Sequence, residues 1–407
     1  MRGRFGEVQP QGFLSPAASL EPLLTPVLAV RLDHVRANAA WAISQLQGSP
    51  DRWRPHLKTT KLPEAWRELA RLGVRHFKCA TTLEAKVFCR TVGAEYPGCD
   101  LLVAYPLQAA GQAHLGQLAA QHPEVTLSVL ADQESVVASV PAGLGMFVDI
   151  NPGMDRTGIP LSETEAILSL VRAFGPRFRG VHLYDGHLHQ ADAAERRREA
   201  HAVYRAGLDL CRRLVQDGLP VGEVVTSGTP TFLDGAAFTG FTEDGIRHRV
   251  SPGTLVFHQS VSEQLYPELK LTPAAVVLSR IVSLPRFGLA TCDAGSKALA
   301  AEAGDPCAVV LGHPEWEACP PSEEHLPLRV SGSPKPGTLL ALVPRHVCPT
   351  VHLHDHALLL DGSDPPIWTP VAARGHETAA DFSTGGPHVP SRTRPVASSR
   401  VRSEGRR

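Results

Sequence analysis

Short apolar segments alternate with amphipathic ones over about residues 28–260, and this alternation limits the folds open to the chain. Each apolar segment has the length of one strand, whereas stretches such as "SETEAILSLVRAFG" show helical spacing. Strand–helix alternation requires a parallel sheet, and eight such units predict a TIM-type (β/α)8 barrel. The eight strand-like segments are "VLAVRL", "FKCAT", "DLLVAY", "TLSVLA", "GMFVDI", "GVHLY", "EVVTSG" and "RVSPGTLVF".

The pattern changes after about residue 271. Segments such as "AAVVLSRIVSLPR" and "TLLALVPRHVC" are separated by glycine and proline turns without long helices, which predicts a mainly antiparallel β-domain. Near the end of the sequence, large apolar residues become rare and arginines accumulate, which is typical of disorder. We therefore expect a barrel over 28–262, a β-domain from 1–27 and 263–375, and a disordered basic tail over 376–407.

Composition restricts the possible partners and the compartment. The net charge of −1 provides no bulk field that would attract nucleic acid or membrane. No apolar run approaches the length that spans a bilayer, so a cytoplasmic protein is expected. The eight cysteines are scattered without a CxxC pair, which indicates reduced thiols rather than a disulfide framework.

The segment "RPHLKTTKLPE" is the first candidate for chemistry. The chain has only 7 lysines against 33 arginines, yet Lys58 and Lys61 lie three residues apart here. A surface charge can be either residue, but an amine that loses its proton and attacks a carbonyl must be lysine. If the segment follows a barrel strand, it lies at the carboxyl end, where barrel enzymes place their chemistry.

This segment resembles the lysine motif of the fold-type III pyridoxal-phosphate enzymes, specifically the D-threonine aldolase and D-serine dehydratase family. The resemblance places Lys58 at the lysine that binds the cofactor covalently. "VDINPGMDRTGI" is similar to another family element and puts Arg156 near the cofactor ring, although Asn151 stands where the family often has an acidic residue. "GVHLYDGHLH" adds His182 and Tyr184 to the cofactor site.

Two later segments are candidates for the phosphate of the cofactor. A phosphate group needs hydroxyl donors and backbone N–H groups that it can approach closely, which small residues in late barrel loops provide. The segments "VVTSGTPT" and "VSPGTLVF" supply such residues at family-like positions. The candidates are Ser227, Gly228, Thr229, Gly253 and Thr254.

The segment "LVPRHVCPTVHLHDH" is a candidate metal site. In a strand, His346 and Cys348 would point to one face and present an imidazole and a thiolate, both good zinc ligands. The resemblance extends here, because family members bind a divalent metal through a histidine and a cysteine or aspartate. Cys348 favours zinc over harder ions. His352, His354 and His356 also alternate on one face and are expected to pack or to support the ligands.

The resemblance implies a lyase that uses pyridoxal phosphate and a divalent metal to act on D-β-hydroxy amino acids. A D-threonine-type aldolase, which would form glycine and an aldehyde, is favoured by "KTTK" and "FKCAT". A D-serine dehydratase remains open, as do an amino-acid racemase and a non-catalytic pyridoxal-phosphate carrier. Small D-amino acids are the expected partners, with neither nucleic acid nor membrane, and a homodimer is expected by analogy.

Overall fold

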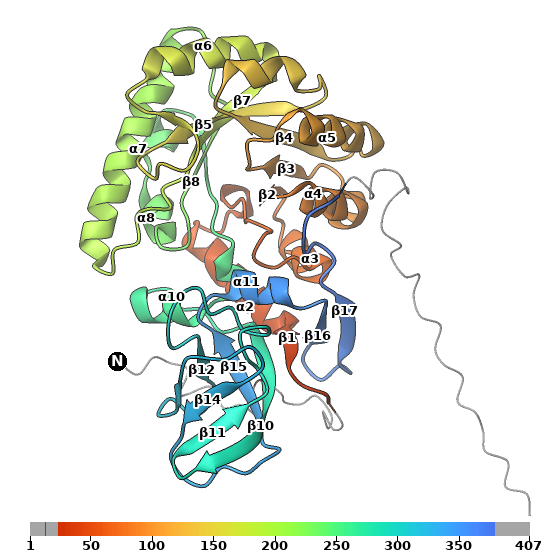
Figure 1. Ribbon diagram of the computed structural model, residues 1–407. Coiled ribbons are helices and arrows are strands. Elements are labelled where there is room, and N and C mark those ends of the chain that lie inside the picture. Colours follow the sequence, from red (N-terminus) through yellow and green to blue (C-terminus); the bar gives the residue numbers. More distant parts are fainter. Residues whose placement is uncertain (1–12, 14–22, 379–407) are drawn as a thin grey trace, which may run out of the picture. The chain divides into compact units, whose positions relative to one another are not determined.

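The computed structural model describes Phe13 and residues 23–378 (Figure 1). The described residues up to Gly375 form one compact unit, and the description below concerns that unit. Most of the tail that the sequence predicts to be disordered, residues 379–407, lies outside the described residues.

A parallel sheet forms the first part of this unit. Its strands follow one another in the order β2-β3-β4-β5-β7-β8-β9, and each pairs in parallel with the next. The short β6 pairs with β5 beside this path. The strands are β2 (His76–Cys79), β3 (Asp100–Val103), β4 (Thr126–Ala131), β5 (Gly145–Asn151), β6 (Ile159–Pro160), β7 (Phe178–Leu183), β8 (Glu223–Thr226) and β9 (Arg247–Val250).

An irregular segment, residues 53–57, joins the two edges of this sheet. Trp53 bridges to Val250 of β9, and His56 bridges to Lys78 of β2, both in parallel. The backbone of Lys78 holds the segment on both sides, because its N–H donates to Pro55 O (3.0 Å) and its carbonyl accepts from the N–H of Leu57 (2.7 Å). The segment therefore occupies the eighth strand position of the predicted barrel.

Helices cover the outside of the barrel (Figure 1). Helix α4 begins with a reciprocal cap, because Thr81 Oγ1 accepts from the N–H of Glu84 (3.1 Å) and the Glu84 carboxylate accepts from the N–H of Ala80 (2.7 Å). The helices are α2 (Leu32–Gln45), α3 (Pro63–Arg71), α4 (Thr82–Phe88), α5 (Ala109–Gln121), α6 (Thr164–Phe174), α7 (Ala193–Gln216), α8 (Phe232–Ala237) and α9 (Gly240–Glu243).

The second sheet is mostly antiparallel, as the sequence predicts for the later part of the chain. Its main path is β13-β14-β11-β10-β1-β16-β17, and β15 pairs with both β10 and β12. The strands are β1 (Val27–Arg31), β10 (Ala275–Arg286), β11 (Leu289–Cys292), β12 (Ala308–Val310), β13 (Glu317–Ala318), β14 (Leu326–Arg329), β15 (Leu339–Pro344), β16 (His356–Leu360) and β17 (Ile367–Pro370). Helix α10 (Ser260–Leu265) precedes β10 in the chain, and helix α11 (Val347–Leu353) lies between β15 and β16.

One strand assignment from the sequence is wrong. The pattern of "VLAVRL" predicts the first barrel strand, but β1 pairs antiparallel with β10 and parallel with β16 in the second sheet. All of its residues are buried, because other strands flank it on both edges and the sheet is covered on both faces. A central strand of any such sheet is continuously apolar, so its pattern cannot be distinguished from that of a barrel strand.

All eight cysteines lie in the described part of the chain and are free thiols, which confirms the prediction of reduced cysteines. Among the described residues, no helix has both the length and the apolar character needed to cross a membrane.

Candidate active site

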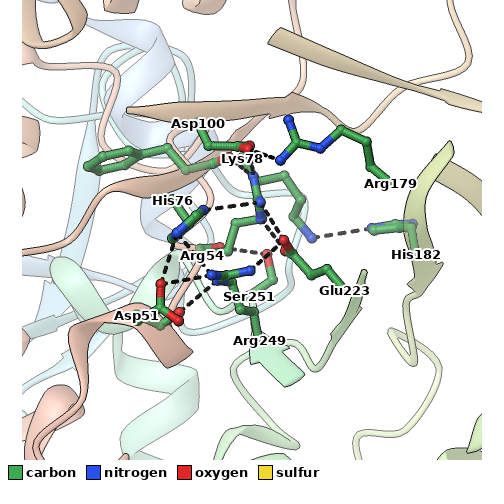
Figure 2. Close-up of polar contacts among 11 residues, drawn as sticks. Asp51, Arg54, His76, Lys78, Asp100, Arg179, His182, Glu223, Arg249 and Ser251 are labelled. Carbon is green, nitrogen blue, oxygen red and sulfur yellow. Dashed lines mark hydrogen bonds and ion pairs between the residues drawn. The ribbon is translucent and has the colours of Figure 1, made fainter. Parts of the chain in front are cut away.

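A charged layer fills the barrel at the amino ends of its strands (Figure 2). Arg54, from the closing segment, is fully buried and lies at its centre. Its guanidinium donates to both carboxylate oxygens of Glu223 (2.8 and 2.9 Å) and to Asp100 (2.8 Å). Arg179 pairs with Asp100 and Arg249 pairs with Glu223, so each buried carboxylate has two arginine partners.

This layer keeps its charges despite burial. Burial would lower the pKa of Arg54, but the charges of Glu223 and Asp100 outweigh it and raise that pKa. An apolar layer of Leu102, Leu130, Phe147 and Val225 forms a separate buried cluster in the barrel strands. The closing segment that precedes Lys58 is thus fixed to a rigid interior rather than held only by backbone pairing.

The two lysines of "RPHLKTTK" have different surroundings. Lys61 is buried, and its Nζ lies 2.5 Å from Glu84 and donates to the carbonyl of Ala373 (3.3 Å). Lys58 is only partly buried, and over residues 23–378 no hydrogen bond or ion pair is found for its Nζ. Lys61 therefore stabilises the fold, and Lys58 is the amine that is available for chemistry.

The wall formed by β5 and β7 is buried and polar. His182 Nδ1 lies 2.7 Å from Asp149 Oδ1, and its Nε2 lies 3.4 Å from Nζ of Lys78. The second carboxylate oxygen of Asp149 is buried and has no hydrogen-bond partner among the described residues. Burial lowers the pKa of His182, although its bond to Asp149 opposes this effect.

Tyr184 joins this wall to the loop that carries Arg156. Its ring stacks nearly parallel to that of His182, with centroids 6.3 Å apart and an interplanar angle of 16°. The guanidinium of Arg156 lies 5.0 Å from the centroid of the Tyr184 ring, a distance suited to a cation–π contact. Asp149, Arg156 and Tyr184 are among the residues that line a pocket here.

The loop after β5 explains the asparagine that departs from the family pattern. Asn151 Oδ1 accepts from the N–H groups of Gly153 and Asp155 (3.0 Å each), and its amide donates to the Asp155 carboxylate (2.9 Å). An asparagine side chain supplies both an acceptor and a donor, so it can close this turn on both sides. Asn151 therefore shapes the loop that presents Arg156.

The candidate phosphate residues after β8 are partly engaged within the fold. Ser227 Oγ lies 2.9 Å from Tyr204 Oη, and the N–H of Gly228 donates to Asp185 Oδ1 (3.2 Å). Asp185 is buried and also accepts from Tyr204. The carbonyl of Thr229 accepts from the N–H of Phe232 (3.4 Å), but in the part of the chain that the structure describes no hydrogen bond is found for its hydroxyl. The other two shape the turn.

The candidates after β9 contact the lysine segment. A Cβ on Gly253 would lie 2.3 Å from the carbonyl oxygen of His56, so only glycine fits this approach. Thr254 Oγ1 lies 3.8 Å from Cys348 Sγ, and Thr59 Oγ1 lies 3.1 Å from the same sulfur. This region therefore brings together the lysine segment, a predicted phosphate loop and a predicted metal ligand.

His346 and Cys348 do not lie on a strand, which corrects the prediction from the sequence. β15 ends at Pro344, His346 is the N-cap of α11, and Cys348 lies in its first turn. Pro349 marks this start, since proline is tolerated in the first turn of a helix and disfavoured within a sheet. The turn still brings the two side chains into hydrogen-bond contact.

The chemistry of this pair suits a soft divalent metal. Burial acts to raise the pKa of the Cys348 thiol, but the hydrogen bond and charge of His346 outweigh it and lower that pKa. His346 Nδ1 lies 2.5 Å from Glu302, the arrangement by which a carboxylate orients a metal-binding imidazole. The described residues contain no group of three or more histidine, cysteine or acidic side chains placed to hold a metal, so among them His346 and Cys348 lack a third partner of these types. The imidazole of His354 is engaged within the fold, with Nε2 3.0 Å from the Ala298 carbonyl.

Sequence reasoning assigned no role in the site to three of its polar side chains: His56, Lys78 and Asp149. The sequence does contain a signal for Lys78. Side chains two residues apart in a strand point to the same face, so in the strand "HFKC" Lys78 points into the barrel together with His76. Buried strands seldom contain lysine, and this one is only 2% exposed.

Comparisons with known proteins show the family and the fold of this chain. The family described as "Alanine racemase, N-terminal domain" matches residues 30–260, and the family described as "Putative serine dehydratase domain" matches residues 274–360. A D-threonine aldolase of Arthrobacter sp. is 28% identical over 384 residues, which cover 88% of this chain and 96% of that protein.

Solved structures show the same fold. The crystal structure of D-threonine aldolase from Filomicrobium marinum has a TM-score of 0.76 and 26% identity, and the match covers 86% of this chain and 96% of that one. A cysteine-to-alanine mutant of a D-threo-3-hydroxyaspartate dehydratase, in the metal-free form, has a TM-score of 0.71 and 20% identity over 88% of this chain and 99% of that one. The chain belongs to the alanine racemase N-terminal family of fold-type III pyridoxal-phosphate proteins, and it carries the dehydratase-like second domain of the D-threonine aldolase and hydroxyaspartate dehydratase group.

Proposed function

We propose that this protein is a pyridoxal-phosphate- and metal-dependent lyase that cleaves D-β-hydroxy amino acids in the manner of a D-threonine aldolase. One observation carries the proposal. Thr59 follows Lys58 directly, and its hydroxyl lies 3.1 Å from the sulfur of Cys348. The amine proposed to hold the cofactor and the thiol proposed to hold the metal are therefore on neighbouring walls of one site.

The residues present fit the cofactor. Lys58 offers an amine without a competing partner in the described structure, Arg156 and Tyr184 flank a pocket, and the unpaired oxygen of Asp149 provides a buried acceptor. Thr229 and Thr254 would meet the phosphate. When bound, pyridoxal phosphate supplies an electron sink for negative charge that develops at the substrate Cα.

The residues present also fit a metal. His346 and Cys348 would hold it as imidazole and thiolate ligands, with Glu302 fixing the imidazole. A divalent ion there would act as a Lewis acid on the β-hydroxyl oxygen of the substrate. Thiolate ligation favours zinc. A D-threo-3-hydroxyaspartate dehydratase has been solved as a cysteine mutant in the metal-free form, and this relative supports the proposal of a metal in the present chain.

Product analysis distinguishes the open alternatives. The purified protein, reconstituted with pyridoxal phosphate and zinc, is incubated separately with D-threonine, D-serine and D-threo-3-hydroxyaspartate. Glycine together with an aldehyde supports the aldolase, whereas a 2-oxo acid with ammonia identifies a dehydratase. Formation of the L-enantiomer would identify a racemase, and no turnover would favour a carrier. The expected homodimer is tested by light scattering on the same preparation.

A further inference from the structure

We propose that Lys78 is a positioning residue of the cofactor pocket, which donates a hydrogen bond to Nε2 of His182 and holds that imidazole neutral and flat against Tyr184. This inference rests on the proposed function only for the identity of the ligand in the pocket. The hydrogen bond itself is a property of the protein without any ligand.

Donor and acceptor chemistry determines the direction of the bond. A carboxylate can only accept, so the 2.7 Å contact between Asp149 Oδ1 and His182 Nδ1 places the imidazole proton on Nδ1. Nε2 then carries a lone pair, and the group facing it at 3.4 Å is Nζ of Lys78. Lys78 donates whether it is an ammonium or an amine. The three side chains thus form a buried chain across β2, β7 and β5, and Figure 2 shows the Lys78–His182 contact.

The charges around Lys78 favour its role as a hydrogen-bond donor to His182 over a role as one member of an ion pair. Burial lowers its pKa well below the usual value, and the nearby charges of Lys58, Arg156 and Arg54 lower it further, against the weaker effect of Asp149. His56, from the closing segment, is partly buried, and burial together with the charges of Lys58 and Lys78 lowers its pKa. No carboxylate within the described residues forms a salt bridge with Lys78. Its amine therefore serves as a donor rather than as half of an ion pair.

The contacts of Lys78 connect two parts of the site. Its Nζ also lies 5.2 Å from the centroid of the Tyr184 ring, the ring that faces Arg156 on the pocket. The tie to the Lys58 segment is made by the Lys78 backbone, through Pro55 and Leu57. Because substitution of the side chain leaves those backbone bonds in place, the role of the amine can be tested separately from closure of the barrel.

The test measures the charge of His182 in the cofactor-free protein. Imidazole nitrogen-15 signals are recorded from pH 5 to 9 for the wild type, Lys78→Met and Lys78→Arg, with His182→Asn to assign the signal. In the wild type, His182 should stay neutral with its proton on Nδ1. Lys78→Met removes the donor and leaves Asp149 in place, so the imidazole should bind a proton about tenfold more tightly, a shift of about one pH unit. Lys78→Arg replaces the amine with a guanidinium, which donates hydrogen bonds and accepts none, so this variant should behave like the wild type.

Absorbance of the bound cofactor provides a second readout. The spectrum of Lys78→Met should depend on pH over the range in which His182 titrates, whereas the spectra of the wild type and Lys78→Arg should not. Adding Lys78→Met to His182→Asn should cause no further pH dependence, since the effect passes through His182. Lys86→Met, which removes another buried lysine on the outer helix α4, is the matched control and should leave both readouts unchanged.

Each outcome has a defined meaning. An unchanged His182 titration in Lys78→Met, or a shifted one in Lys78→Arg, overturns the proposal. If Lys78→Met does not fold, the wild-type signal decides, because a proton on Nε2 or an imidazolium near neutral pH contradicts the assigned bond. If His182 responds as expected while the cofactor spectrum does not, the Lys78–His182 bond holds and the proposed cofactor position fails.

Discussion

Replacement of Arg54 by methionine should destabilise the protein severely, although Arg54 belongs to the motif that carries the candidate catalytic lysine. The fully buried guanidinium makes two bonds to Glu223, one to Asp100 and one to the Phe77 carbonyl (3.0 Å). Methionine fills much of the same space but leaves the partner carboxylates underpaired. Loss of one member of a buried ion pair typically costs about 3–5 kcal/mol.

The structure places Arg54→Met at the lower end of this range. Glu223 keeps Arg249 and Asp100 keeps Arg179, so neither carboxylate becomes unpaired. We therefore expect a loss of about 3 kcal/mol in the free energy of unfolding. Arg54→Lys keeps the positive charge but lacks the forked guanidinium that binds both oxygens of Glu223. It should lower the free energy of unfolding by roughly half as much.

Urea unfolding followed by circular dichroism provides the assay, with midpoints compared at equal slope because a chain of this size can unfold through intermediates. Arg67→Met is the control, since the Arg67–Glu95 pair lies on the surface and should contribute less than about 1 kcal/mol. An Arg54→Met protein within about 1 kcal/mol of the wild type would refute the reasoning, because it would mean that water or rearrangement compensates the two carboxylates.

Three further predictions address the site and the pH dependence. Borohydride reduction and peptide mapping should label Lys58 and not Lys61, whose amine is bound to a glutamate; label on Lys61 would reverse the assignment. Chelation, or Cys348→Ala, should abolish lyase turnover and preserve the absorbance of bound cofactor, whereas His354→Ala should retain turnover; full activity in metal-free protein would contradict the metal proposal. Burial lowers the pKa of His248 to about 3, so the unfolded state binds its proton first as the pH falls below about 6.5. Acidification from pH 7 to 5 should therefore remove about 2 kcal/mol of stability, measured by urea midpoints, and His248→Gln should lose less over the same interval.

The barrel could be predicted from strand–helix alternation, but its closure could not. Residues 53–57 contain an arginine, a proline and a histidine and show no apolar run, because Arg54 is compensated by carboxylates from β3 and β8 that are distant in sequence. Meanwhile β1 has the apolar run that a barrel strand would have. A continuous apolar pattern indicates that a strand is buried on both faces, but it does not indicate which sheet the strand belongs to.

The candidate site shows a similar division. Lys58 could be singled out from residue type and motif, because the chemistry of an amine is local. The distinction between Lys58 and Lys61 depends on Glu84, and the role of Lys78 depends on His182 from the far side of the barrel. Such contacts are set by the register of strands, which the sequence encodes only through the whole fold.

The position of β1 also has a consequence for synthesis on the ribosome. Strands β2 to β9 come from one continuous stretch, so the barrel can begin to assemble as that stretch emerges. β1 precedes them and must wait for β10 and then for β16, which emerges roughly 330 residues after β1, or roughly 15–65 s at typical translation rates. Both edges of this apolar strand are open to wrong partners until β10 emerges, and one edge stays open until β16 emerges. The nascent chain is therefore most exposed to aggregation at its first strand, and chaperone dependence should centre on that segment.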